Sequence, residues 1–158
     1  MIRRYLLAAG LAAVIAGPLA AQANERDIRE LNRAELESAK KQIVAANMTL
    51  TDTESQAFWP LFDQYQTKRR ANTERRVALI ERYADRYGAM TDVAADSLAK
   101  EWLDIEKERS DLAREWYPKF RKVLPAAKAA RFMQIENKLQ VLIDYQLAAN
   151  IPLVPAPQ

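Results

Sequence analysis

The sequence predicts an all-α protein, and three observations lead to that fold class. Its 158 residues include only 3 Gly and no Cys or His, whereas the good helix formers Ala, Leu, Glu, Lys and Arg are frequent. Apolar residues recur at three- and four-residue spacing, and no run alternates β-branched residues as a strand would. One stop, Gly88 to Asp92, interrupts the stretch 58–120, which we therefore expect to fold as a long antiparallel helical hairpin.

Two prolines set the expected register of this hairpin. Pro60 lies 30 residues before Met90 and Pro118 lies 28 residues after it, so folding the chain at Met90 brings both prolines to one level. Each proline removes a helical hydrogen bond and clashes with the preceding turn, so we expect paired kinks. At about 1.5 Å per residue each arm is roughly 40 Å long, which favours a binding surface over a catalytic pocket.

Residues 1–23 are typical of a secretory signal peptide. Two arginines precede an uncharged apolar run at 5–17, and Ala21-Gln22-Ala23 matches a small-x-small cleavage site, so the mature chain begins near Asn24. The apolar run, at about 13 residues, is short for a bilayer span. An uncleaved anchor is the alternative. We expect an exported protein, cleaved near Ala23, that does not insert into a membrane afterwards; the lack of Cys excludes a lipid-anchored lipoprotein.

Charge argues against a nucleic-acid partner. The chain has 24 basic and 21 acidic residues, but the leader holds two of the arginines and no acid, so the mature chain keeps 22 basic residues and a net charge of +1. A protein this close to neutrality exerts no global attraction on nucleic acid.

Residues 24–150 are expected to form one all-helical domain. Pro125 suits the first turn of the last helix, because its missing N–H does no harm there. Gly88 is predicted as a left-handed C-cap of the second helix. The expected helices are 25–46, 51–87, 92–123 and 124–150, followed by a Pro-rich extended tail at 151–158.

Apolar periodicity predicts the buried faces of the last two helices. The third helix has the most regular stripe, which Arg109 interrupts. Its stripe consists of Leu98, Trp102, Ile105, Leu112, Trp116, Phe120 and Val123. The face of the fourth helix consists of Phe132, Ile135, Leu139 and Leu142.

A short motif at the start of the second helix carries a family resemblance. In Leu50-Thr51-Asp52-Thr53-Glu54, Thr51 and Glu54 have the spacing of a capping box. The stretch resembles the Leu-Thr-x-x-Gln signature of the Spy/CpxP-like family of periplasmic helical proteins, with Glu54 in place of Gln. A second copy is expected before the last helix, where Leu124-Pro125-Ala126-Ala127-Lys128 has Pro for Thr and Lys for Gln. The resemblance covers 25–149.

The resemblance implies a fold and a function. It implies four helices, a cradle-like dimer with a basic concave side, and a location in the periplasm. It further implies an ATP-independent chaperone, or holdase, that binds partly unfolded polypeptides during envelope stress. Two alternatives come from the same superfamily: an adaptor that binds one folded partner, such as the sensor domain of a stress kinase, or a metal-response protein.

Composition argues against an enzyme. Without His or Cys the usual general bases and nucleophiles are missing. Acid pairs such as Asp104 and Glu108 are expected by chance on so acidic a helix. Met48, Met90 and Met133 are scattered, whereas thioether copper sites need clustered methionines. We therefore expect no catalytic residue, no metal site and no cofactor.

A basic run on the second helix is the candidate surface for clients, meaning partly unfolded polypeptides. Arginine offers both charge and adaptable apolar contact. The candidate residues are Lys68, Arg69, Arg70, Arg75, Arg76 and Arg109. Pairing with the third helix is the alternative: facing positions sum to about 178 in the proline register, which places Arg70 opposite Glu108 and Asn72 opposite Glu106. Both interpretations stay open at this point.

Aromatic content predicts a homodimer. A long two-helix arm cannot bury both its faces against two shorter helices, and exposed apolar patches of that size usually mark an interface. The aromatic residues expected to exceed the needs of one thin core are Phe58, Trp59, Trp102, Trp116 and Tyr117.

Overall fold

The computed structural model describes residues 34–156, and the predicted all-α fold is confirmed for this part of the chain. The chain divides into two compact units, 1–43 and 44–158. The predicted signal peptide and the first turns of the predicted helix 25–46 lie outside the described residues. None of the helices within 34–156 is long and apolar enough to cross a membrane.

The first unit is described only from residue 34 to residue 43. These residues begin a helix that spans 34–47 and ends one residue later than predicted. Leu36 is 72% exposed, and the Gln42 amide donates a hydrogen bond to the Ser38 hydroxyl at 3.4 Å. The described turns are therefore mostly exposed, polar helix.

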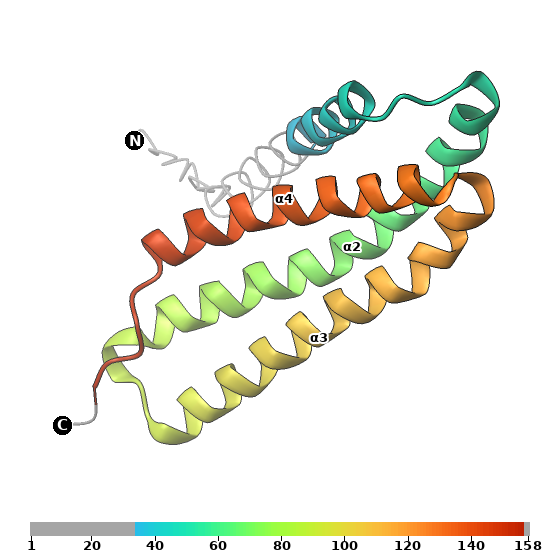
Figure 1. Ribbon diagram of the computed structural model, residues 1–158. Helices are drawn as coiled ribbons and strands as arrows, with labels where there is room; N and C mark the ends of the chain where they lie inside the picture. The colour runs from blue at the N-terminus through green and yellow to red at the C-terminus, as the bar shows by residue number, and fades with distance from the viewer. Residues whose placement is uncertain (1–33, 157–158) are drawn as a thin grey trace, which may run out of the picture. The chain divides into compact units, whose positions relative to one another are not determined.

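The second unit contains three long helices and one short one. They are α2 (Asp52–Arg86), the 3-10 turn η1 (Tyr87–Ala89), α3 (Asp92–Val123) and α4 (Ala126–Asn150). The long helices lie side by side, and each runs antiparallel to the one before it (Figure 1). Beyond α4, residues 152–156 are not helical, as predicted, and lead back toward the turn between α2 and α3 (Figure 1).

Threonine caps begin both arms of the hairpin, and the sequence predicts the one at Thr51. At α2 the Glu54 N–H donates to the Thr51 hydroxyl at 3.3 Å, and the Thr51 N–H donates to the Glu54 carboxylate at 2.8 Å. This is a complete capping box. At α3 the Thr91 hydroxyl accepts from the Ala94 N–H at 3.2 Å. Each cap satisfies a backbone N–H that the first helical turn leaves unpaired.

The end of α2 corrects the prediction for Gly88. No glycine among residues 34–156 has a positive φ, so Gly88 is not a left-handed cap. The helix instead closes through η1, where the Tyr87 N–H donates to the Ala84 carbonyl. A tightened 3-10 turn satisfies the final carbonyls without a left-handed residue.

Both arms of the hairpin continue through their prolines. Pro60 lies within α2 and Pro118 lies within α3, and both are exposed. The Phe58 and Phe120 rings meet across the hairpin with centroids 5.6 Å apart. The two proline segments therefore lie at one level, in the predicted register, while the paired kinks stay a prediction.

An aromatic core joins the three helices near the start of α4. Phe132 is fully buried, and its ring lies 4.6 Å from Phe120, 5.2 Å from Phe58, and 6.0 Å from both Phe62 and Tyr65. Val44, Met48 and Leu124 complete the same cluster. A second, smaller cluster of Leu79, Leu98 and Ile105 lies nearer the hairpin turn. Most of the burial that stabilises the fold is thus at one end of the hairpin.

The same core corrects the argument for a homodimer. Phe58 is fully buried and Trp116 is 4% exposed, both inside the cluster of one chain, and Trp59 is half-buried against it. Only Trp102 and Tyr117 of the five predicted aromatics are exposed. The aromatic side chains of α2 and α3 therefore give no argument for a dimer, because Phe132 of α4 covers them within one chain. The homodimer itself stays a prediction.

Phe132→Ala is expected to destabilise the protein by about 3–5 kcal/mol, because a cavity replaces a ring in contact with four others. Urea unfolding followed by circular dichroism measures the change. Leu142→Ala on the same helix, at a position 63% exposed, is the matched control and is expected to change stability by less than about 1 kcal/mol. Equal losses in the two variants would contradict this placement of the core.

Candidate functional site

The buried side of α4 changes from apolar to polar along the helix. Ala129 and Phe132 are buried near its start, but Glu136 and Gln140 take the same position in the following turns. Of the predicted apolar face, Ile135 packs against the large cluster and Leu139 is half-buried, whereas Leu142 is exposed and was wrongly assigned to the core. The reason for the buried polar residues lies on α2, which presents arginine and glutamine side chains toward α4, and these need carboxylate and amide partners rather than leucine.

These polar side chains form one layer between the two apolar clusters. Along α2 the large cluster extends to Tyr65 and the small cluster begins at Leu79, so the polar layer occupies the interval. We define the polar layer as Gln66, Arg69, Asn72, Arg76, Glu136, Gln140 and Asp144. It joins α2 to α4 and to α3.

Arg69 is the centre of the polar layer. Its guanidinium donates to the Gln140 side-chain carbonyl at 2.6 Å and lies 3.8 Å from the Glu136 carboxylate. The Gln66 amide donates to the other oxygen of Glu136 at 3.1 Å. The side chains of Arg69 and Glu136 are only 13% and 3% exposed, so this is a buried pair whose charges depend on one another.

A second link of the layer joins Arg76 to Asp144. The guanidinium contacts the carboxylate at 2.5 Å, and the Gln140 amide donates to the same oxygen at 2.9 Å. Burial alone would raise the pKa of Asp144, but the hydrogen bonds from Gln140 and Arg76 hold it below its ordinary value of 3.8. Asp144 therefore stays ionised at neutral pH and holds Arg76 against α4.

The contacts between α2 and α3 follow the predicted register. The Asn72 amide donates to the Ile105 carbonyl at 2.9 Å and to the Glu108 carboxylate at 3.2 Å. Arg75 forms an ion pair with Glu108. The predicted position of Asn72 opposite Glu106 is thus one residue off, since Asn72 bonds Ile105, the residue before Glu106. Glu108 is answered by Arg75 as well as Asn72.

The structure places most of the predicted basic surface in ion pairs or hydrogen bonds. Arg69 and Arg76 belong to the polar layer, Arg75 pairs with Glu108, and Arg109 pairs with Glu106 within α3. Lys68 is exposed on α2, and Arg70 beside it is half-buried. Neighbouring helices therefore neutralise Arg69, Arg75 and Arg76, and Arg109 is neutralised within its own helix.

The partners on α4 are the residues that the sequence reasoning missed. Glu136, Gln140 and Asp144 recur every four residues, which puts them on one face of a helix. That spacing was a usable signal. Apolar periodicity does not detect this spacing, because it identifies the buried face of a helix only when that face is hydrophobic.

The Leu50–Glu54 stretch and the 124–128 stretch lie in contact. The Lys128 ammonium, in the degraded second copy, contacts the Glu54 carboxylate of the first copy at 2.5 Å. Leu50 packs against the large cluster, and Thr51 caps α2. Both departures from the family pattern, Glu54 and Lys128, thus meet as an ion pair that joins the start of α2 to the start of α4.

Four large apolar side chains are exposed in the C-terminal half of α4, spread over more than one side of the helix. Val141, Leu142, Ile143 and Tyr145 are 55%, 63%, 53% and 69% exposed, and we call them the α4 outer row. Single exposed apolar residues are common on proteins, whereas a contiguous group on one helix usually marks a contact surface. The sequence analysis assigned Leu142 of this row to the core.

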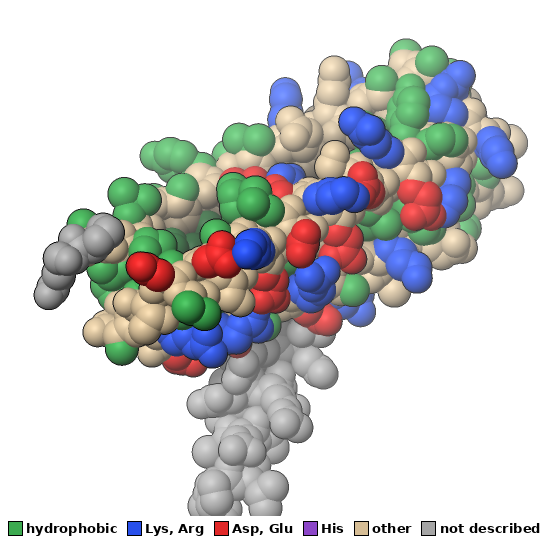
Figure 2. Space-filling view, turned by 90° about the horizontal axis from the view of Figure 1, so that it is seen from below, with side chains coloured by type: hydrophobic (Ala, Val, Ile, Leu, Met, Phe, Trp, Pro, Cys, Tyr) green, Lys and Arg blue, Asp and Glu red, His purple; other side chains and the backbone are tan. Residues whose placement is uncertain are grey.

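Charged side chains of both signs are mixed over the face drawn in Figure 2. Lys and Arg are interspersed with Asp and Glu across its middle, and hydrophobic side chains appear toward both ends (Figure 2). This face has no broad area of a single sign. Within residues 34–156, no three His, Cys, Asp or Glu side chains are grouped in a way that could hold a metal ion.

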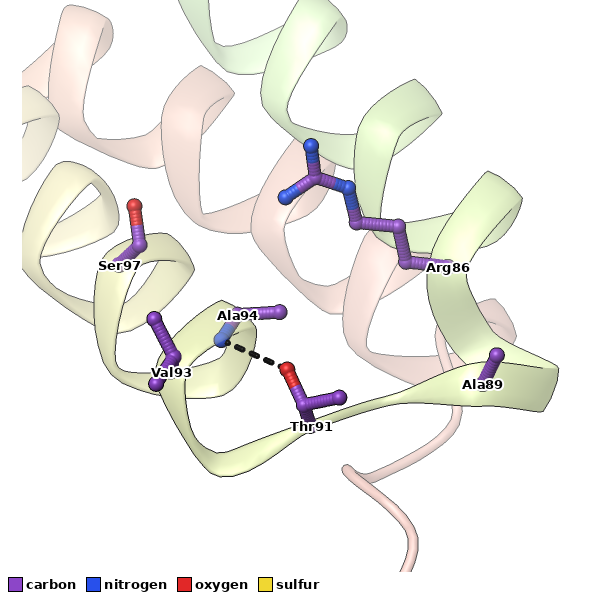
Figure 3. Close-up of a pocket in the computed structure, with 6 residues that line it drawn as sticks. All are labelled: Arg86, Ala89, Thr91, Val93, Ala94 and Ser97. Atoms are coloured by element: carbon purple, nitrogen blue, oxygen red, sulfur yellow. Dashed lines mark hydrogen bonds between the residues drawn. The ribbon is translucent and has the colours of Figure 1, made fainter.

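A shallow pocket of about 460 Å³ lies at the hairpin turn. Arg86 reaches over it from α2, and Thr91, Val93 and Ser97 line it from the turn and α3 (Figure 3). The Thr91 hydroxyl is already used by the cap of α3. With one cation, two hydroxyls and no carboxylate in its lining, the pocket offers no acid–base pair for catalysis.

A second hollow, of about 490 Å³, lies along the hairpin between α2 and α3. Its floor includes the buried side chains of Leu79 and Leu98, and Tyr83 and Trp102 line it as well. The non-helical residues 151–154 form its remaining wall. It is mainly apolar and open to solvent on one side.

Replacing Glu54 by Gln should remove a pH-dependent part of the stability. The hydrogen bond from Lys128, and next the Thr51 N–H, lower the pKa of Glu54 below its ordinary value of 4.5. A depressed carboxyl pKa adds stability at higher pH that is lost as the pH falls below 4.5. Wild type should exceed Glu54→Gln in urea midpoint at pH 7, and the gap should close toward pH 3. A gap independent of pH, or one unchanged in a Lys128→Gln background, contradicts the assignment.

Glu136→Ala should destabilise the protein by about 3–5 kcal/mol, because it leaves the buried Arg69 guanidinium without its carboxylate. The double change Arg69→Met with Glu136→Leu should recover most of that loss, since an apolar pair replaces an ionic one of similar size. Glu115→Ala, in an exposed pair with Lys119, is the control and should cost less than about 1 kcal/mol. Urea unfolding measures the stability of all three variants. If Glu136→Ala is as stable as wild type, the pair has no structural role.

No family model, no curated protein and no solved structure matches this chain. The likeness to the Spy/CpxP-like family therefore rests on the Leu50–Glu54 motif and on its position in an all-helical chain.

Proposed function

We propose that the protein is an exported, ATP-independent holdase that binds partly unfolded polypeptides weakly. The observation that carries this proposal is the α4 outer row: four large apolar side chains, each more than half exposed, on a helix whose other side is held by charged partners. Such a surface is too open to enclose a small molecule and suits an apolar stretch of another chain.

Basic side chains of α2 would add charge attraction to these apolar contacts. Lys68 is exposed on α2. Arg75 is partly exposed as well, although its guanidinium is paired with Glu108. Long basic side chains combine an apolar stem with a charged end, so they adapt to clients of different sequence. In this proposal the main role of Arg69, Arg76 and Arg109 is structural, through their ion pairs. They contact clients only with the parts of their side chains that reach the protein surface.

Sequence features favour the same function. The predicted leader favours an envelope compartment, where ATP is not at hand and binding without an energy source is expected. The Spy/CpxP-like resemblance favours a periplasmic holdase in envelope stress, and the complete capping box at Thr51 supports that resemblance.

An adaptor for one folded partner is the second candidate. The observation that favours it is the position of the α4 outer row on a single continuous helix, since such a row fits a groove on one specific protein. Cross-linking in the envelope separates the two functions. Many partners of diverse fold indicate a holdase, and one enriched partner, such as a sensor domain, indicates an adaptor.

We also propose a homodimer whose interface includes the α4 outer row, so that dimerisation and client binding compete for this surface. Self-complementary pairing of one patch is the commonest way to cover an exposed apolar group. Light scattering at tens of micromolar measures the assembly. A monomer at that concentration, in both wild type and an outer-row variant, would exclude the dimer and leave the row available to clients.

Leu142→Ser with Ile143→Ser is expected to weaken client protection about fivefold or more, because it removes the apolar contact surface while the core stays intact. The measurement is suppression of aggregation of a reduced or heat-treated client by equimolar mature protein at low salt. Val77→Ser with Val93→Ser, which removes two apolar side chains exposed elsewhere on the hairpin, is the matched control. Suppression equal in all proteins would exclude the outer row, and no suppression by wild type would exclude the holdase.

A further inference from the structure

The chain after α4 returns over the apolar hollow of the hairpin. We call residues 151–156 the strap. Its first four residues form one wall of the hollow, and the other walls come from α2 and α3. A volume of about 490 Å³ remains between the strap and the hairpin, so the strap covers the hollow without filling it.

The strap has the backbone of an extended, proline-rich peptide. Ile151 has φ −93° and ψ 116°, and prolines at 152 and 155 keep the chain extended. Proline carries no N–H, so Pro152 and Pro155 can be held only through their carbonyl oxygens and side chains. The Pro152 carbonyl accepts a hydrogen bond from the Tyr83 hydroxyl at 2.9 Å.

The hollow presents the features that bind extended peptides in other proteins. Aromatic side chains flank it, namely Tyr83 and Trp102, and Tyr83 supplies the donor for a backbone carbonyl. Leu79 and Leu98 form an apolar floor for an inserted side chain. Arg76 also lines the hollow, but its charge is answered by Asp144 at 2.5 Å, so the site favours a neutral segment.

The strap is held loosely. Leu153 is 88% exposed and Val154 is 51% exposed, although both line the hollow. Neither belongs to the two apolar clusters that stabilise the fold. Segments with few buried contacts open at low cost in free energy, so the strap can leave while the helices stay folded.

We propose that the hollow of the hairpin is a binding site for extended, neutral, proline-containing apolar peptides, and that the strap is its built-in occupant. An incoming segment of this chemistry displaces the strap, accepts a hydrogen bond from the Tyr83 hydroxyl at one of its carbonyl oxygens and places an aliphatic side chain over Leu79 and Leu98. The site is distinct from the α4 outer row and does not depend on holdase activity, because it binds a defined peptide rather than an aggregating client.

The test uses the full chain with residues 151–156 replaced by Gly and Ser, and a fluorophore-labelled peptide Ile-Pro-Leu-Val-Pro-Ala-Pro-Gln. Fluorescence anisotropy measures binding. The strap-replaced protein should bind the peptide, and wild type should bind it about tenfold more weakly or worse, because the tethered strap competes at high effective concentration. The variant Leu153→Asp with Val154→Asp, which disfavours the strap in the apolar hollow, should behave like the replacement.

Two controls locate the peptide. Tyr83→Phe in the strap-replaced protein should weaken binding about two- to tenfold through loss of one hydrogen bond, whereas Tyr145→Phe, outside the hollow, should leave it unchanged. Equal affinity for wild type and both strap variants overturns the competition. No binding to either variant, with thermal midpoints equal to wild type, overturns the site. The result of the aggregation assay bears on neither outcome.

Discussion

The pairing of Arg69 and Arg76 with residues of α4 is the interaction on which the arrangement of this protein depends. A guanidinium inside a protein must be matched by acceptors, since an unpaired buried charge costs far more than a lost apolar contact. Glu136, Gln140 and Asp144 supply those acceptors at four-residue intervals, and α4 must therefore turn this face toward α2. The aromatic cluster around Phe132 fixes where α4 begins to pack, and the polar layer fixes its rotation farther along.

The helix α4 turns a polar face toward α2 and exposes apolar residues elsewhere. Val141, Leu142, Ile143 and Tyr145 all meet solvent. The helix that the ion pairs hold in place thus presents an exposed apolar surface. The basic residues of α2 orient α4, and α4 in turn presents the outer row to solvent.

The ion pair between Glu54 and Lys128 likewise fixes how two helices meet, here at the starts of α2 and α4. Each residue, taken alone, departs from the Leu-Thr-x-x-Gln pattern and weakens the family resemblance. Together they replace two neutral amides by an ion pair at 2.5 Å, which lowers the pKa of Glu54 and leaves its capping role intact. The starts of α2 and α4 are thereby joined by charge, beside the aromatic cluster that joins them by apolar contact.

Local chemistry let the sequence alone determine the helical class, the Thr51 cap, the hairpin turn and its register. Capping, turn formation and apolar spacing act within a few residues or along one hairpin. Gly88 is the local exception, because a 3-10 turn closed α2 without the left-handed residue that glycine permits. The rotation of α4, the destination of Arg69 and Arg76, and the hollow under the strap were decided only by tertiary structure. Residues 66–76 and 136–144 are about seventy positions apart, and their match depends on how α4 packs after the aromatic cluster forms. An apolar stripe marks the buried face of a helix only when its neighbour is apolar, and here the neighbour carries arginine.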